Sequence, residues 1–285
     1  MTRFVSIRFA VKLFFERRDR SYLREYDALY IVSRYCERKG IPKDVDSTNL
    51  LLPFHFRDTA QDTSDASIQS QPHLVLPFAK GGDLFQTMRH IVQQKCDVFT
   101  NEEIRVVSLG IVKGTLTLQK ARLVHFDLKP NNVLITHIDD ENGRISNVTL
   151  CDLGVSVLSG TKSPRVQVEG FGAPETRVAG HSIDAALDVF ALGAILLEMV
   201  LVANGVSMIS SKELETLQEP CEYGKVLLQN FKIDMPHVSK FTLEMVSLVG
   251  KCWSCDPDQR PSPEDLVRVF ENFAVEEDEI DSTPH

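Results

Sequence analysis

Apolar and polar residues alternate near the start of the chain. The apolar positions are Val5, Ile7, Phe9, Val11 and Leu13. A period of two predicts a half-buried strand, on which Lys12 and Ala10 share a face. From residue 21 to residue 36 the apolar spacing is that of a helix instead, and this predicted helix contains Glu25.

The next part of the chain predicts short strands and a long polar loop. Residues 49–56 read as a strand interrupted by Pro53, and residues 57–72 have little to bury and predict an exposed loop. A strand at residues 73–78 leads into a Gly-Gly turn before the helix that begins at Leu84. We expect a hinge between two lobes at this turn.

The expected organisation is therefore an N-terminal lobe over residues 1–79 and a larger C-terminal lobe over residues 80–273. Residues 274–285 form an acidic tail with little to bury, which predicts disorder. Strands in the first lobe and mostly helices in the second predict a two-lobed α+β fold.

Helical patterns dominate the second lobe. Thr100 and Glu103 have the spacing of a capping box, and a helical apolar stripe follows them. Residues 133–135 and 148–151 read as a pair of strands around a polar turn. Residues 185–200 are apolar on all sides, which predicts a helix in the core.

Composition limits the class of protein. The chain has 285 residues, of which 43% are hydrophobic and 25% charged, so it can bury a full core. A net charge of −9 argues against an electrostatic nucleic-acid or membrane-surface binder. We expect no membrane span, because no apolar run reads as approaching the roughly 18–20 residues required, and residues 1–18 do not read as a signal peptide.

The six cysteines are scattered through a chain too large to need disulfide bonds for stability, so reduced, mostly buried thiols are expected. Cys252 and Cys255 form a CxxC pair, but no second pair or histidine cluster completes a zinc site.

The sequence HFDLKPNN at residues 125–132 concentrates the candidate chemistry. Asp127 can accept a proton from a substrate hydroxyl, and Lys129 can neutralise charge on a transferred phosphoryl group. Asn132 and Asp152 offer oxygen ligands for Mg²⁺. A polar surface turn would explain any one of these residues, but it does not explain the whole string at this spacing.

From about Arg8 to Phe273 the chain resembles the eukaryotic protein kinases. HFDLKPNN is similar to their catalytic loop, DLG at residues 152–154 to their metal-binding DFG, and GAPE at residues 172–175 to the end of their activation segment. The resemblance also implies that Asp188 braces the catalytic loop and that Arg260 pairs with Glu175. It assigns Cys252 and Cys255 to helix packing.

The resemblance implies ATP as the cofactor, with Mg²⁺, and a protein as the substrate. Lys12 would bind the nucleotide phosphates with Glu25 as its partner, and Ala10 would lie beside them. Residues 73–83 look like the hinge of the family: Leu76 would gate the pocket, Pro77 and Ala79 would present backbone groups to adenine, and Asp83 would approach the ribose. Lys129 favours serine or threonine as the acceptor.

Three departures from the family pattern qualify this expectation. No glycine precedes Lys12, so the glycine-rich loop is absent, and either the chain is an incomplete copy or its N-terminal lobe is truncated. Phe126 stands where many kinases have an arginine that binds a phosphorylated activation loop, so phosphorylation there is not expected to be the main switch. Val168 replaces a threonine typical of serine/threonine kinases.

Two functions stay open: an active kinase, or a pseudokinase or scaffold that keeps the fold and binds a partner. Within the family, LLPF and GFGAPET look like the rhoptry kinases of apicomplexan parasites. That group implies a secretory organelle or the host cell, whereas the chain as written reads as cytoplasmic. The protein substrate and the oligomeric state are not identified by the sequence.

Overall fold

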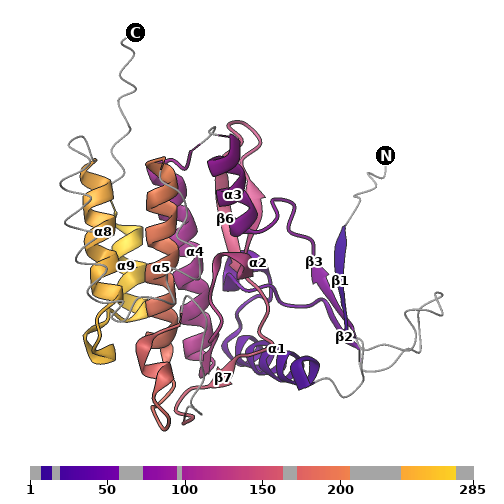
Figure 1. The fold of residues 1–285 in the computed structure, drawn as a ribbon. Coiled ribbons are helices and arrows are strands. Elements are labelled where there is room, and N and C mark those ends of the chain that lie inside the picture. Colours follow the sequence, from indigo (N-terminus) through magenta and orange to yellow (C-terminus); the bar gives the residue numbers. More distant parts are fainter. Residues whose placement is uncertain are drawn as a thin grey trace, which may run out of the picture.

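The computed structural model describes residues 8–14, 20–57, 73–94, 98–162, 172–205 and 239–273. It has the two-lobed α+β architecture expected from the sequence, with a small strand-containing lobe beside a helical one (Figure 1). The expected loop at residues 57–72, apart from Arg57, and the expected acidic tail at residues 274–285 lie outside the described residues, as does Val168.

The N-terminal lobe consists of a small antiparallel sheet and a long helix. Its elements are β1 (Phe9–Leu13), α1 (Arg20–Lys39), α2 (Val45–Thr48), β2 (His55–Arg57) and β3 (His73–Pro77). The strand order is β1-β3-β2, so β3 lies in the centre and β1 at an edge. Ala10 lies opposite Leu76 and Lys12 opposite Leu74 in the register of β1 and β3. Lys12 and Ala10 therefore share the sheet face expected from the alternation.

The C-terminal lobe is built mainly from helices, and its short strands form two pairs. Its helices are α3 (Leu84–Gln94), α4 (Asn101–Lys120), α5 (Ala185–Ala203), α8 (Lys240–Cys252) and α9 (Pro263–Glu271). Its strands are β4 (Leu123–Val124), β5 (Val133–Ile138), β6 (Ile145–Leu150) and β7 (Val157–Leu158), and its 3₁₀ turns are η1 (Pro130–Asn132), η2 (Pro174–Arg177) and η3 (Pro257–Gln259). Strand β5 pairs with β6, and β4 pairs with β7. The β4–β7 pair was not expected, because two-residue strands carry no readable period.

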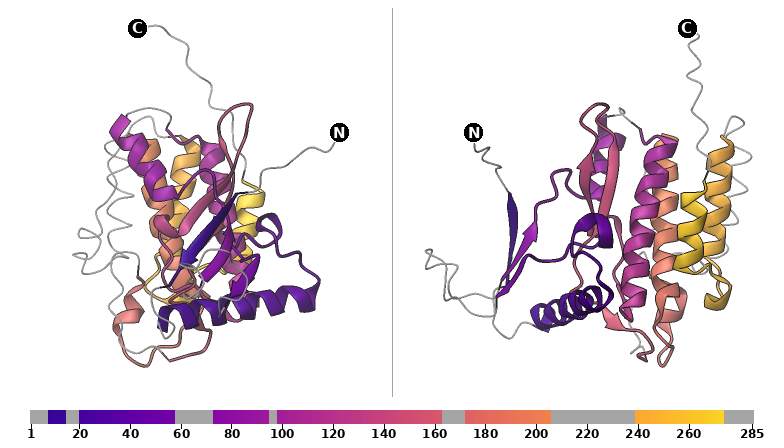
Figure 2. Two further views of the ribbon diagram at one scale, coloured as in Figure 1. Left: turned by 90° about the vertical axis from the view of Figure 1, so that its right-hand side faces the viewer. Right: turned by 180° about the vertical axis from the view of Figure 1, so that it is seen from behind.

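Helix α5 is the centre of the C-terminal lobe: α4 and α8 pack along it, and α9 packs against α4 (Figures 1 and 2). The expectation that no apolar run reaches the length of a membrane span is wrong for this helix. Its length and composition would suffice, but 94% of its most apolar stretch is buried inside the protein, which identifies it as the core helix. Close packing requires Gly193, because a Cβ there would lie 2.9 Å from Cys252 Cβ.

The expected capping box opens α4. The Thr100 side chain accepts a hydrogen bond from Glu103 N, and the Glu103 carboxylate accepts one from Thr100 N at 3.0 Å. Glu103 also accepts a hydrogen bond from Ile145 N at 3.0 Å, so the same buried carboxylate ties the start of α4 to the start of β6. The sequence predicted the cap, but not this second contact across 42 positions.

The segment after α2 joins the two lobes. The expected strand at residues 49–56 is wrong in its bounds, because only His55–Arg57 forms a strand and residues 49–51 pair with β6 instead. Leu150 N donates to Asn49 O at 2.9 Å, and Leu51 N donates to Leu150 O at 2.8 Å. A Cβ at Gly114 of α4 would lie 2.7 Å from Asn49 O, so glycine is needed for this approach.

The cysteines within the described residues are of two kinds, free and disulfide-bonded. Cys36, Cys151 and Cys252 are free, and Cys252 packs against α5 as expected. Cys255 is disulfide-bonded. The expectation of reduced thiols, and of a packing role for Cys255, is therefore wrong at this position. Cys96 and Cys221 lie outside the described residues. No group of three or more His, Cys, Asp or Glu side chains able to hold a metal occurs within the described part of the chain.

Candidate active site

The loop that follows β4 is shaped by Asp188 of α5. The Asp188 carboxylate accepts hydrogen bonds from His125 N at 2.8 Å and from Phe126 N at 3.0 Å. Phe126 has a φ of 70°, a strained conformation for a bulky residue, which these two bonds help to hold. Burial raises the pKa of Asp188, and the nearby His125 and the two backbone N–H groups oppose this effect. The bracing geometry implied for Asp188 is therefore present.

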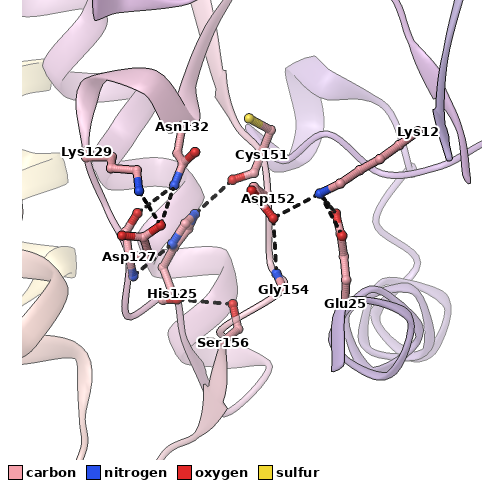
Figure 3. Close-up of polar contacts among 10 residues, drawn as sticks. All are labelled: Lys12, Glu25, His125, Asp127, Lys129, Asn132, Cys151, Asp152, Gly154 and Ser156. Carbon is pink, nitrogen blue, oxygen red and sulfur yellow. Dashed lines mark hydrogen bonds and ion pairs between the residues drawn. The ribbon is translucent and has the colours of Figure 1, made fainter. Parts of the chain in front are cut away.

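Asp127, Lys129 and Asn132 form one hydrogen-bonded group in this loop (Figure 3). Lys129 Nζ lies 2.7 Å from Asp127 Oδ2. Asn132 Nδ2 donates to Asp127 O at 2.7 Å and to Asp127 Oδ2 at 3.2 Å. Since its amide nitrogen is engaged with Asp127, the orientation of Asn132 is fixed and its Oδ1 can serve as an oxygen ligand.

A second contact couples this loop to the DLG segment. His125 Nε2 lies 3.0 Å from Cys151 O, and Ser156 Oγ donates to His125 O at 3.3 Å. His125 is fully buried, and Asp152 has a φ of 61° that turns the chain immediately after Cys151. No such contact was predicted from the sequence for His125 or Ser156, although His125 begins the HFDLKPNN string. Together they fix the position of Asp152 relative to Asp127.

Lys12 brings the two lobes together. Its Nζ lies 2.8 Å from Glu25 Oε2 of α1 and 3.0 Å from Asp152 Oδ1, across 140 positions of sequence (Figure 3). Glu25 is buried, whereas the side chains of Lys12 and Asp152 are 35% and 49% exposed. The predicted Lys12–Glu25 pair is therefore formed, and it points into the same space as Asp152.

Burial and pairing act in opposite directions on the pKa values of these groups. Burial lowers the pKa of Lys12, but the hydrogen bonds and charges of Glu25 and Asp152 outweigh it and raise the pKa. Burial raises the pKa of Glu25, and Lys12 only partly offsets this. Burial also acts to raise the pKa of Asp152, but Lys12 reverses the sign and lowers it. Lys12 is thus held as a cation and Asp152 as an anion.

The residues predicted for the hinge lie in β3 and in the turn that leads to α3, and Ala10 lies in the neighbouring strand β1. Ala10 and Leu76 are register partners, and Leu76 is buried. Gly81 N donates to Ile135 O at 3.1 Å, and Ile135 N donates to Gly82 O at 2.9 Å, so the chain after Pro77 and Ala79 is fixed against β5. Asp83 accepts hydrogen bonds from Gln86 N at 2.9 Å and from Gln86 Nε2 at 2.7 Å. It caps the start of α3, a structural use that the sequence did not suggest.

Glu175 and Arg260 form the buried pair implied for them. Arg260 Nη2 donates to Glu175 Oε2 at 2.8 Å, and Arg260 Nη1 also donates to Ala186 O at 3.0 Å. The guanidinium lies 5.0 Å from the centre of the Phe190 ring, which stacks on Trp253. This group fixes η2 against α5 without contacting Asp127 or Asp152 directly. A pocket lined by Asp127, Lys129, Gly172 and Leu187 lies between the catalytic loop, η2 and α5.

Oxygen donors suited to a magnesium ion are present. Asn132 contributes an amide oxygen, and Asp152 a carboxylate whose anionic form Lys12 stabilises. Mg²⁺ keeps several water ligands and completes its shell with phosphate oxygens, so one amide and one carboxylate suffice. These residues therefore fit a metal-bound nucleotide phosphate.

Comparison with known proteins identifies the class. A family model described as "Protein kinase domain" matches residues 54–269, more than half of the chain, and the chain belongs to this family. The matched region contains Asp127, Lys129, Asn132 and Asp152. Lys12 and Glu25 lie before it, so their assignment depends on the geometry of the structure.

Similar proteins are kinases from several kingdoms. The chain is 26% identical over 217 residues to a calcium and calcium/calmodulin-dependent serine/threonine-protein kinase of Lilium longiflorum, which covers 75% of this chain and 37% of the relative. It is 29% identical over 201 residues to rhodopsin kinase of Homo sapiens, covering 67% and 34%. It is 32% identical over 130 residues to a mitogen-activated protein kinase kinase of Aspergillus fumigatus, covering 44% and 24%. The chain thus spans about a third of the length of the first two.

Proposed function

We propose that this chain is an active protein kinase that transfers the γ-phosphate of Mg-ATP to serine or threonine residues of protein substrates. The observation that carries the proposal is the contact of Lys12 Nζ with both Glu25 and Asp152. It supports the proposal because Lys12, from one lobe, would bind the nucleotide phosphates beside Asp152 of the other lobe, which would hold Mg²⁺. A scaffold that only binds a partner would not need this arrangement across the cleft.

In the proposed reaction the residues of this chain position and stabilise charge. Asp127 accepts the proton of the substrate hydroxyl, and Asn132 holds the orientation of Asp127 through two hydrogen bonds. Lys129 lies where it can offset negative charge on the transferred group. Lys12 orients the nucleotide phosphates, and bound Mg²⁺, held by Asn132 and Asp152, would neutralise their charge.

The proposal also covers the amino acid that accepts the phosphate and the subgroup of protein kinases to which the chain is related. Lys129 in the catalytic loop supports serine or threonine as the acceptor, which phosphoamino-acid analysis of a labelled substrate would test.

We further propose that the chain is related to the rhoptry kinases and works in an oxidising compartment or beyond it. The disulfide at Cys255 supports this, because disulfides rarely persist in the cytosol. Finding Cys255 fully alkylatable in freshly lysed native cells would contradict it.

The activity is tested by phosphotransfer to a generic basic protein. We expect Asp127→Asn to lower the rate by roughly 10²–10⁴-fold, the range for loss of a general base, and Asp152→Ala to abolish magnesium-dependent transfer. Asp140→Asn is the matched control, because Asp140 lies on the exposed turn between β5 and β6, and its rate should stay within twofold of wild type.

A pseudokinase is the alternative, and nucleotide binding separates the outcomes. Mg-ATP should raise the thermal midpoint of the wild-type protein, since a ligand that binds only the folded state stabilises it. Equal incorporation by wild type and both site variants would reject catalysis by this site. A thermal shift without transfer would instead support a nucleotide-binding scaffold.

A further inference from the structure

A short backbone pairing follows the DLG segment. Gly160 N donates to Ile183 O at 2.8 Å, and Ile183 N donates to Thr161 O at 2.9 Å. Lys162 and Ser182 face each other as an antiparallel bridge. We call this pairing of residues 160–162 with residues 182–183 the 160–183 clamp.

The same segment is held along its other side by β4. Leu123 pairs with Leu158 and Val124 with Val157, and Ser159 N donates to Arg122 O at 2.9 Å. Gly160 has a φ of 86°, which turns the chain from one pairing to the next and favours glycine. The start of the activation segment is therefore fixed by backbone hydrogen bonds on two sides.

The clamp leads directly to the residues that shape the catalytic loop. Ile183 is buried, and Asp184 after it caps α5 by accepting a hydrogen bond from Ala186 N. One turn further, Asp188 holds the backbone of His125 and Phe126. The segment is also linked to the loop itself, because Ser156 Oγ donates to His125 O.

Phe126 has no charge with which to bind a phosphate. It packs, partly buried, against the hydrophobic core. A protein that orders its activation segment through phosphorylation needs a cation to receive the phosphate, and the position beside the catalytic aspartate does not supply one. Backbone pairing needs neither a phosphate nor a particular side chain.

We propose that the 160–183 clamp holds the start of the activation segment, up to Lys162, in its present position without phosphorylation, in place of the usual arginine–phosphate contact. The inference rests on the proposed kinase activity, because it states how that activity is regulated. If the clamp acts in this way, the catalytic groups are already assembled in the unphosphorylated chain.

Hydrogen exchange tests the clamp independently of catalysis. In phosphatase-treated protein, the amides of Gly160 and Ile183 should exchange at least about 100-fold more slowly than the amide of Asp140 in the exposed β5–β6 turn. Exchange of all three at similar rates would overturn the proposal, whether or not the protein transfers phosphate.

A reversible cross-link tests the function of the clamp. Ile183 N bonds to Thr161 O beside the bridge, so Lys162 and Ser182 form a narrow, non-hydrogen-bonded pair whose Cβ atoms suit a disulfide. The oxidised Lys162→Cys/Ser182→Cys variant, without phosphorylation, should transfer phosphate within twofold of its reduced form. Each single cysteine variant, treated with the same oxidant, is its control.

Breaking the clamp should have the opposite effect. Gly160→Val places a β-branched residue at positive φ and should lower transfer at least about tenfold, while Mg-ATP still raises the thermal midpoint. Adding the oxidised 162–182 cross-link to Gly160→Val should restore transfer to within about threefold of wild type. Failure of this rescue in a folded protein would refute the clamp.

Two further results separate the clamp from the kinase proposal. Phosphatase treatment of active wild type should change its rate less than twofold, and a large loss that rephosphorylation reverses would refute the clamp. If wild type transfers no phosphate at all, the kinase proposal fails, and hydrogen exchange alone decides whether the clamp exists.

Discussion

At the scale of single residues, Lys12 connects parts of the site that lie far apart in the sequence. Its ammonium is the point where β1, α1 and the DLG segment meet. It also determines the charge state of its neighbours, because it lowers the pKa of Asp152 and limits the rise that burial causes in the pKa of Glu25. The loss of Lys12 would therefore change two groups, Glu25 and Asp152, together.

Replacing Lys12 by methionine should lower the rate of phosphotransfer by roughly 10²–10³-fold, the range for loss of one preorganised charge-stabilising group. It also leaves Glu25 buried without its cation, so Glu25 should take up a proton more readily. The measurement is transfer to a basic protein with the folded state checked by circular dichroism. Lys43→Met is the control, because Lys43 forms an exposed ion pair with Glu37 and should leave the rate unchanged.

At the scale of elements, α5 organises the C-terminal lobe. Its first turns hold the catalytic loop through Asp188 and receive Arg260, and its middle packs on Cys252 and Trp253. Near its end lies Glu198, which is buried with only 4% of its surface exposed. Burial raises the pKa of Glu198 to about 8, so this carboxyl is mostly neutral at pH 7.

Glu198 should make stability depend on pH. Its pKa rises from 4.5 to about 8 on folding, so the folded state binds the proton more tightly than the unfolded state. The free energy of unfolding should therefore fall as pH rises from about 4.5 to about 8. Glu198→Gln, which cannot ionise, should have a higher thermal midpoint than wild type at pH 8. The two midpoints should be similar at a pH equal to the pKa of Glu198 in the unfolded wild-type chain.

The control for this prediction is Glu244→Gln, on the exposed face of α8. Its difference from wild type should be small and should not change across the same pH range. If Glu198→Gln and Glu244→Gln gave the same pH profile, the buried carboxyl would not be the cause.

At the scale of the whole molecule, two of the contacts between the lobes differ in strength. Residues 49–51 are fixed to β6 by backbone hydrogen bonds, and Gly114 allows their close approach to α4. The second contact is the partly exposed ion pair of Lys12 and Asp152, which can break when a nucleotide competes for the ammonium. The backbone pairing therefore fixes the lobes together, whereas the ion pair can open when the ligand binds.

The disulfide at Cys255 should contribute to the stability of the whole chain. Reduction should cost about 2–4 kcal/mol, which for a protein of this size lowers the thermal midpoint by roughly 5–15 °C. Cys255→Ser should show the lower midpoint without reductant and no further change with it. A wild-type midpoint that does not respond to reductant would contradict the prediction, and peptide mapping would identify the cysteine bonded to Cys255.

The sequence by itself determined the kinase class, the two-lobed fold and the capping box of α4. The sequence could do so because each of these features depends on the local spacing of apolar residues or on residues close together in the chain, such as Asp127, Lys129 and Asn132. Only the tertiary structure decided what depends on long-range contacts: that residues 49–51 pair with β6, that Asp83 caps α3, and that Cys255 is bonded. It also decided that Lys12 reaches Asp152, because the backbone path between them spans both lobes and no local pattern specifies how those lobes close on each other.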